Sequence, residues 1–151
     1  MTTRIGINGF GRIGRTYLRA ALAGGADVEV VAVNDLTDAG TLATLLEWDS
    51  VNGHFGGVAV EDDGLRVADR VIKVFSEPEP ARIPWGEVGA DVVIDATGFF
   101  TDREKAAEHL RGGARKVIVS APAKGDVPTF VLGVIDDRLD VSAADVFSNG
   151  S

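Results

Sequence analysis

Cysteine is absent from all 151 residues of the chain, and this absence removes several kinds of chemistry. Without it the chain has no disulfide framework, no thiolate ligand for a metal ion and no thiol nucleophile of its own. Long apolar runs are absent too, since no stretch approaches the roughly 18 residues of a membrane-spanning helix. The first residues lead directly into an apolar strand without a signal-peptide pattern, so we expect a cytoplasmic protein with no membrane partner.

Positive charge is scarce. The chain has 15 lysines and arginines against 23 aspartates and glutamates, which gives a net charge of −8. Binding to nucleic acid irrespective of sequence depends on basic side chains that meet phosphates, so we expect no nucleic-acid partner. A phosphate-containing ligand would have to be bound by backbone amides instead. The length suits one domain, and 45% hydrophobic and 25% charged residues are typical of globular proteins.

The most informative stretch is residues 5–15, in which a short apolar strand runs into a glycine-rich turn and the start of a helix. Gly9, Gly11 and Gly14 form the pattern G-x-G-x-x-G. In this setting Gly9 permits a tight turn, Gly11 lets a pyrophosphate approach bare backbone, and Gly14 allows close packing of helix and strand. The anion would lie against the free amides at the positive end of the helix dipole.

An acidic residue follows at the distance that such a turn requires. The helix continues over 17–23 and stops at Gly24-Gly25, and the β-branched strand 28–33 ends in Asn34-Asp35. A carboxylate about 20 residues after the glycines binds the ribose hydroxyls of a dinucleotide. The alternative is that Asp35 only caps the helix that begins near Thr37 or Asp38. With all parts in order, the sequence favours a dinucleotide-binding βαβ unit.

The rest of the chain is expected to form further helices, strands and loops. We expect helices over 38–47, with Asp38 as a cap, and from Thr101 or Asp102 to Leu110; short antiparallel strands at 58–60, 65–67 and 71–75; strands at 91–94, 116–119, 129–132 and 145–147; a turn-rich segment at 48–55; an extended loop at 76–84; and a turn or short helix at 136–139. The predicted fold is α/β, a Rossmann-type doubly wound, mostly parallel sheet with a small antiparallel hairpin insertion.

Small residues follow two of these strands, at Thr97-Gly98 and at Ser120-Ala121. Ligands of doubly wound sheets lie across the carboxyl ends of the strands, so both places are candidate contacts, although Gly98 also suits an ordinary turn. The two histidines are less informative. We interpret His54 as an ordinary surface residue with no partner carboxylate, and we expect His109 to be solvated near the end of its helix.

Taken together, these segments closely resemble the N-terminal half of phosphorylating glyceraldehyde-3-phosphate dehydrogenase. The matching segments occur in the order of that family and span nearly the whole chain: 6–15 (Gly-Ile-Asn-Gly-Phe-Gly-Arg-Ile-Gly-Arg), 33–35 (Val-Asn-Asp), 48–51 (Trp-Asp-Ser-Val), 96–101 (Ala-Thr-Gly-Phe-Phe-Thr), 112–114 (Gly-Gly-Ala), 117–122 (Val-Ile-Val-Ser-Ala-Pro) and 148–149 (Ser-Asn). The resemblance implies that residues 1–151 form the NAD-binding domain.

The resemblance also implies a set of cofactor contacts. Arg12 and Ile13 would contribute backbone near the pyrophosphate, Asp35 would bind the adenosine ribose, and Thr97, Gly98 and Ser120 would flank the nicotinamide half. The full set that it implies is Asn8, Gly9, Phe10, Gly11, Arg12, Ile13, Asn34, Asp35, Pro78, Thr97, Gly98, Phe99, Ser120 and Ala121 for the cofactor, with Ser151 near the substrate. A carboxylate roughly 4 Å from a 2′-phosphate costs on the order of a few kcal/mol, so Asp35 implies NAD rather than NADP.

In this family the segment matching 148–151 leads directly into a catalytic cysteine, and the activating histidine lies much further on. The parent enzyme, expected to be a homotetramer, oxidises glyceraldehyde 3-phosphate in glycolysis with NAD and phosphate. A chain without the catalytic half is therefore expected to bind NAD and to be inactive. Pro78 departs from an arginine common near the adenine, Ile135 from an asparagine and Asn52 from a histidine.

A helix from the end of the family's chain folds onto the NAD domain, so we expect an exposed apolar strip on one face of the sheet where it is missing. Two other readings remain. The chain could be the same half of an erythrose-4-phosphate dehydrogenase, or a separate module or scaffold that binds NAD or an adenosine nucleotide. A different α/β dehydrogenase family is disfavoured by the segments 120–122 and 148–149.

Overall fold

The computed structural model of the chain describes residues 1–150. The α-helices are α1 (Arg12–Ala23), α2 (Ala39–Glu47) and α3 (Arg103–Arg111), and two short 3-10 helices are η1 (Pro80–Arg82) and η2 (Asp136–Arg138). The strands are β1 (Thr3–Asn8), β2 (Val28–Asn34), β3 (Trp48–Asp49), β4 (Gly53–His54), β5 (Val58–Glu61), β6 (Gly64–Val67), β7 (Arg70–Phe75), β8 (Val92–Asp95), β9 (Lys116–Val119) and β10 (Val146–Ser148).

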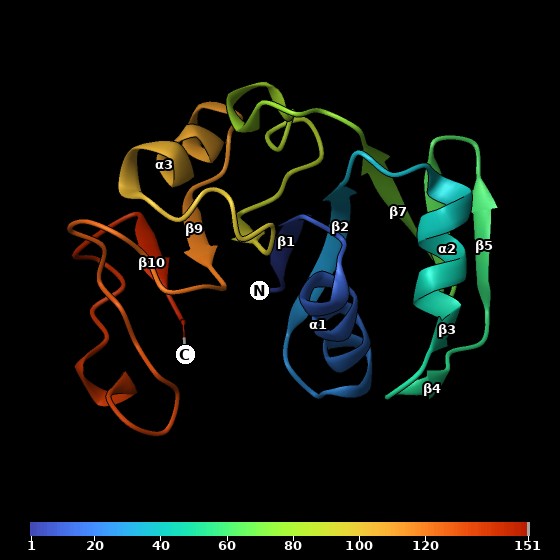
Figure 1. The fold of residues 1–151 in the computed structure, drawn as a ribbon, viewed down its shortest axis with the longest axis horizontal. Helices are drawn as coiled ribbons and strands as arrows, with labels where there is room; N and C mark the ends of the chain where they lie inside the picture. Colours follow the sequence, from blue (N-terminus) through green and yellow to red (C-terminus); the bar gives the residue numbers. More distant parts are fainter. Residues whose placement is uncertain (151) are drawn as a thin grey trace.

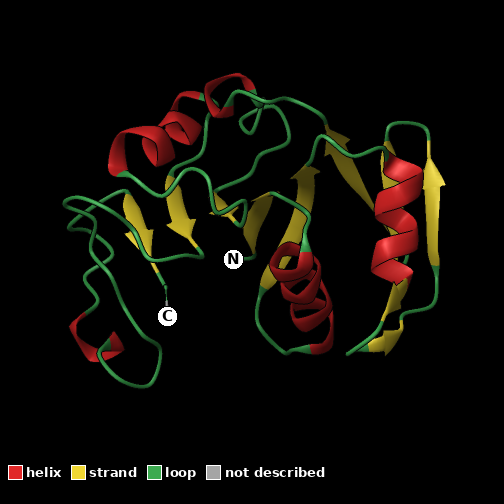
Figure 2. Ribbon diagram, in the orientation of Figure 1, coloured by secondary structure: helices red, strands yellow, loops and turns green. Residues whose placement is uncertain are grey.

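One sheet of eight strands crosses the molecule in the order β10-β9-β8-β1-β2-β7-β6-β5 (Figure 1). Neighbouring strands from β10 to β7 pair in parallel, whereas β6 pairs antiparallel with both β7 and β5. The predicted α/β class, with a mostly parallel sheet and an antiparallel insertion, is confirmed (Figure 2). No helix within residues 1–150 has the length and apolar character that crossing a membrane requires.

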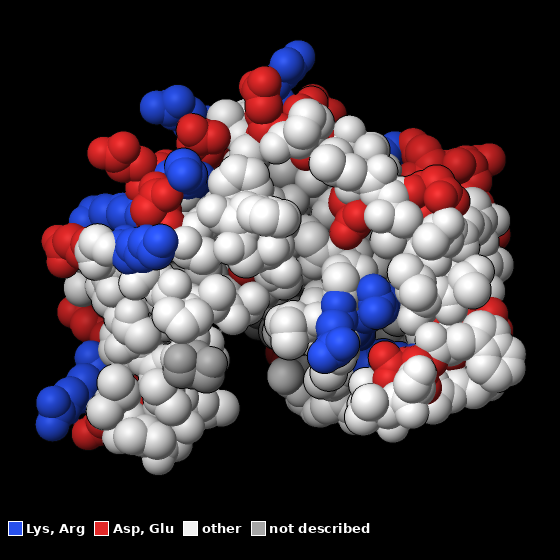
Figure 3. Space-filling view, viewed as in Figure 1, with Lys and Arg blue, Asp and Glu red and all other residues white. Residues whose placement is uncertain are grey.

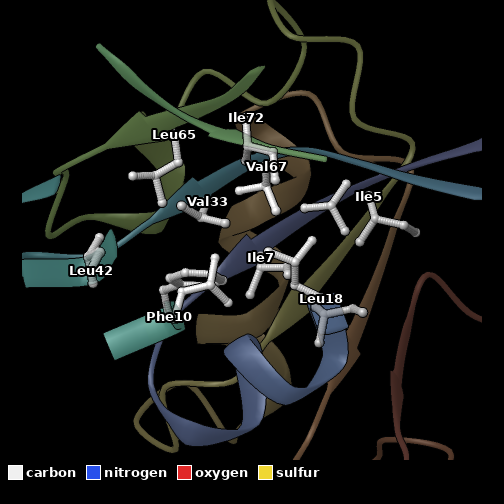
Figure 4. Close-up of a cluster of buried hydrophobic side chains, with 12 residues drawn as sticks. Ile5, Ile7, Phe10, Leu18, Val33, Leu42, Leu65, Val67 and Ile72 are labelled. Atoms are coloured by element: carbon white, nitrogen blue, oxygen red, sulfur yellow. The ribbon is translucent and has the colours of Figure 1, made fainter. Parts of the chain in front are cut away.

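The helices lie on both faces of the sheet. Leu18 of α1 and Leu42 and Leu46 of α2 belong to the same core cluster as Ile5 and Ile7 of β1. Figure 4 labels Leu18, Leu42, Ile5 and Ile7 in this cluster. Along β1 the intervening residues point to the opposite face, because side chains alternate along a strand. There the ring of Trp85 lies against Gly6, where a Cβ atom would come within 2.5 Å of the indole.

Two of the helices begin at aspartate caps, as the sequence predicts. The Asp38 carboxylate accepts a hydrogen bond from the Thr41 amide, and that of Asp102 accepts one from the Lys105 amide. Hydrogen bonds from Thr41 hold the pKa of Asp38 below its ordinary value, and the Lys105 amide lowers the pKa of Asp102. Helix α1 differs, because it begins after Gly11 and no side chain among residues 1–150 caps it.

One predicted strand is wrong, and two predicted loop segments contain short elements. Residues 129–132 form no strand: Thr129 makes one isolated bridge to Ser148, and the chain then turns away through Gly133 at a φ of 79°. The loop 76–84 contains η1, and the segment 48–55 contains the hairpin β3–β4. Strand β7 pairs antiparallel with β6 as expected, but it also pairs in parallel with β2 and so joins the insertion to the main sheet.

An apolar groove lies over β8, β9 and β10, between these strands and the segment 130–141. Its apolar lining includes Val92, Ile118, Phe130, Leu132 and Phe147. In Figure 3 the surface is hollowed between the lobe that holds this segment, at lower left, and helix α1. The apolar strip expected on one face of the sheet is therefore present.

The two-residue turn between β6 and β7 offers a test of the fold. Ala68 and Asp69 have φ values of 48° and 65°, as in a type I′ turn, and alanine is a poor residue at the first position. We predict that Ala68→Asn raises the free energy of unfolding by about 0.5–1 kcal/mol, because asparagine tolerates the left-handed region. Urea denaturation measures the change. Ala26→Asn, in an exposed loop of ordinary φ, is the control, and equal changes in both variants would contradict the prediction.

Candidate functional site

A pocket opens at the carboxyl edge of the sheet, between the ends of β1, β2 and β8. This is where the order of the strands reverses, since the chain proceeds from β1 to β2 on one side and later to β8 on the other. Eight residues predicted from the sequence line it: Asn8, Gly9, Gly11, Asn34, Asp35, Pro78, Thr97 and Phe99. Segments far apart in the sequence thus meet where the βαβ unit predicted a ligand.

The glycine turn has the geometry that its pattern predicts. Gly9 has a φ of 86°, and a Cβ atom there would lie 2.9 Å from the Thr97 amide nitrogen. A Cβ atom on Gly14 would collide with the carbonyl oxygen of Gly9, so helix α1 packs directly on the turn. Gly11 is exposed, with no atom within 4 Å of where its Cβ would be. The start of α1 is therefore open to a ligand.

Asp35 holds this turn in place. Its carboxylate accepts hydrogen bonds from the Phe10 amide at 2.8 Å and from the Thr37 amide at 2.9 Å. The cap of helix α2 is Asp38, not Asp35, so the alternative in which Asp35 merely caps that helix is wrong. Asp35 is half-buried, and its carboxylate borders the pocket.

Comparison with known proteins identifies the family. Residues 3–103, well over half of the chain, match the family described as "Glyceraldehyde 3-phosphate dehydrogenase, NAD binding domain". The chain belongs to this family. It is 52% identical over 152 residues to glyceraldehyde-3-phosphate dehydrogenase 1 of Streptomyces avermitilis, 53% to the glyceraldehyde-3-phosphate dehydrogenase of Geobacillus stearothermophilus and 51% to glyceraldehyde-3-phosphate dehydrogenase 1 of Bacillus subtilis. Each alignment covers 100% of this chain and 45–46% of the relative.

Other residues expected from the family resemblance lie outside the pocket lining. The Phe10 side chain is 1% exposed in the core, so only its backbone faces the turn. Arg12 and Ile13 are exposed at the start of α1, and Gly98 forms the turn between Thr97 and Phe99 at a φ of 75°. Ser120 and Ala121 follow β9 and do not line this pocket. The substrate contact expected at Ser151 lies outside the described residues.

Four residues that line the pocket were not predicted as site residues: Leu36, Glu77, Ala96 and Phe100. Leu36, Ala96 and Phe100 adjoin predicted residues, so proximity in sequence is a usable signal for them. Glu77 reaches the pocket because β7 pairs in parallel with β2, and the Glu77 amide donates to Asn34 Oδ1 at 2.9 Å. The local pattern, which reads as an antiparallel hairpin, contains no signal for that pairing.

The two histidines differ from what we expect from the sequence. His54 is exposed as expected, but its Nε2 lies 3.3 Å from Glu47 Oε1, and it does not line the pocket. His109 is not solvated. It is 0% exposed and lies between Asp95 and Trp85. The reason is that α3 packs against η1 and β9, which places His109 on its buried side within reach of Asp95 at the end of β8.

The position of Asp35 predicts a structural effect. Asp35→Ala removes the acceptor of two backbone amides, so we expect the free energy of unfolding to fall by about 1–2 kcal/mol. Urea denaturation measures it. Asp137→Ala is the matched control, since Asp137 is exposed on η2. If both variants unfold at the same urea concentration, Asp35 does not hold the glycine turn.

Proposed function

We propose that this chain binds NAD in the pocket at the carboxyl edge of the sheet and forms the cofactor half of an NAD-dependent glyceraldehyde-3-phosphate dehydrogenase. The observation that carries the proposal is that the uncapped start of helix α1 and the carboxylate of Asp35 border the same pocket. Helix α1 has no side-chain cap among residues 1–150 and no acidic residue in its first turn, while the Asp35 carboxylate lies at the end of β2.

The start of α1 supports a site for the diphosphate. The first amides of a helix have no partner within it and lie at the positive end of its dipole, so they favour an anion. Gly11 leaves space directly before these amides. The backbone of Arg12 and Ile13 would contribute to this contact, and the arginine side chain adds positive charge nearby.

Asp35 has capacity left for the adenosine ribose. A carboxylate has about four lone-pair sites, and the Phe10 and Thr37 amides occupy two of them. Two sites remain for ribose hydroxyls. Leu36 and Phe99 are 68% and 80% exposed, and with Pro78 they provide apolar surface at the pocket for the adenine ring.

The nicotinamide half would lie toward Thr97, Gly98, Ser120 and Ala121, which follow β8 and β9. Bound NAD supplies a hydride acceptor, and the role of this chain is to hold and orient it. A thiol nucleophile would have to come from outside these residues, because the chain has no cysteine. The parent reaction is the oxidative phosphorylation of glyceraldehyde 3-phosphate, carried out with a catalytic half in a homotetramer. The names of the relatives support this substrate over erythrose 4-phosphate.

Selectivity between NAD and NADP tests the proposal. We expect calorimetric titration to show that NAD binds at least tenfold more tightly than NADP, because the 2′-phosphate would meet the Asp35 carboxylate. In Asp35→Asn this ratio should fall toward one. The ratio isolates the charge effect, since any disturbance of the glycine turn affects both ligands. Asp137→Asn is the control, and an unchanged ratio in Asp35→Asn would remove Asp35 from the ribose site.

A second prediction concerns activity. Mixed with NAD, glyceraldehyde 3-phosphate and phosphate, the chain alone should produce no NADH, because it contains no thiol. Absorbance of the reduced nicotinamide measures turnover, with a full-length relative as the positive control. Sustained turnover by the isolated chain would contradict the proposal that it provides only the cofactor site.

A further inference from the structure

A series of buried polar side chains is joined by hydrogen bonds next to the pocket, and the proposed function gives no role to several of them. Its members, here called the buried network, are Trp85, His109, Asp95, Asn8 and Asn34. They are between 0% and 3% exposed. Asn8, Asn34 and Asp95 are the last residues of β1, β2 and β8, whereas Trp85 follows η1 and His109 lies in α3. Buried polar groups are costly unless each is hydrogen-bonded, so the partners show what the network does.

Trp85 determines the proton position on His109. The indole Nε1 of Trp85 lies 3.0 Å from Nδ1 of His109, and an indole N–H can only donate. Nδ1 must therefore carry no proton, and the imidazole proton lies on Nε2. That nitrogen is 2.8 Å from Asp95 Oδ2, to which it donates. His109 is thus a neutral imidazole in one tautomer, with both nitrogens engaged.

Asp95 receives donors on both carboxylate oxygens. Besides His109, the Asn8 amide donates to Oδ2 at 3.0 Å. Thr97 donates twice to Oδ1, from its amide at 3.1 Å and from its hydroxyl at 2.7 Å. Four donors converge on a side chain that is 1% exposed, and they offset the cost of burying its charge. Asp95 is therefore the common hydrogen-bond partner at the centre of the network.

The branches from Asp95 through Thr97 and through Asn8 end in walls of the pocket. The Thr97 hydroxyl accepts from the Phe99 amide at 3.1 Å, which fixes the turn 97–99. Asn8 precedes the Gly9 turn and accepts from Asn34 Nδ2 at 2.8 Å. Asn34 in turn binds both the amide and the carbonyl of Glu77. Three walls from distant parts of the chain are joined through one carboxylate.

We propose that His109 and Trp85 are positioning residues for the dinucleotide site, which act by holding Asp95 as the acceptor that joins these three walls. Neither residue lines the pocket. The ring of Trp85 packs against Gly6, so the orientation of its N–H is fixed. The hydrogen bond from this N–H orients the His109 ring, whose Nε2 then donates to Asp95. This inference rests on the proposed function for the identity of the ligand, but the shape of the pocket walls can be measured without any ligand.

Two substitutions of His109 separate hydrogen bonding from packing. In His109→Gln the side-chain carbonyl can accept from Trp85 while the amide nitrogen donates to Asp95, as in the tautomer inferred for His109. His109→Leu fills the space without either bond. The matched controls are His54→Gln and His54→Leu, because His54 is exposed and outside the pocket.

The first readout is amide hydrogen exchange of the ligand-free protein, followed by NMR. We expect exchange of the Thr97 and Phe99 amides to accelerate about tenfold in His109→Leu, with a smaller effect at Glu77, and to remain near wild type in His109→Gln. The second readout is NAD affinity, which should fall about tenfold in His109→Leu and recover in His109→Gln, as expected for losing a hydrogen bond to a charged group. Neither control should change.

Equal effects of Gln and Leu, or no effect of either, would overturn the proposal. If His109→Leu fails to fold, nitrogen chemical shifts of the wild-type imidazole decide it, because a proton on Nδ1 would exclude the Trp85 bond. The wild-type chain could bind no NAD while amide exchange at Thr97 and Phe99 still accelerates in His109→Leu and not in His109→Gln. In that case the proposed function fails and the positioning role of His109 is supported.

Discussion

Strand β1 pairs in parallel with β2 on one side and with β8 on the other, and the rest of the structure depends on this double pairing. Strands β2 and β8 lie in different halves of the sheet, and the connections that follow them lead away from β1 in opposite directions. The carboxyl ends of the three strands consequently leave a pocket. The glycine turn after β1 lines this pocket. It fits closely against Thr97 because Gly9 has no Cβ atom and adopts a φ of 86°.

Much of the fold could be predicted from local pattern. Residues 28–33, 116–119 and the helix starts at Asp38 and Asp102 are specified by β-branched runs and by capping side chains within a few positions. The wrong strand prediction at residues 129–132 has a physical cause. Residues 129–132 have the composition of a strand, yet they meet the sheet through a single bridge to Ser148. Whether a segment becomes a strand depends on a neighbour's free edge, which the segment itself does not encode.

Some residues of the candidate site could likewise be predicted from local pattern, and others could not. Gly9, Gly11 and Asp35 could be predicted because the turn and the acid belong to one βαβ unit, in which spacing along the chain determines position in space. The place of Glu77 in the pocket and the burial of His109 could not be predicted, because each depends on a tertiary contact. For Glu77 this contact is the parallel pairing of β7 with β2, and for His109 it is the packing of α3 over Asp95.

Asp35 and Asp95 show how burial gives one residue type two roles at the same edge of a sheet. Both follow or end a parallel strand, and both accept backbone amides. Asp35 is half-buried and keeps lone pairs for a ligand, whereas the four donors around Asp95 use the capacity of its carboxylate. A carboxylate with every site occupied cannot also accept a proton from a substrate without losing a bond. Asp95 is therefore suited to hold the pocket together, whereas the contacts that we propose for the cofactor are made by Asp35 and the open start of α1.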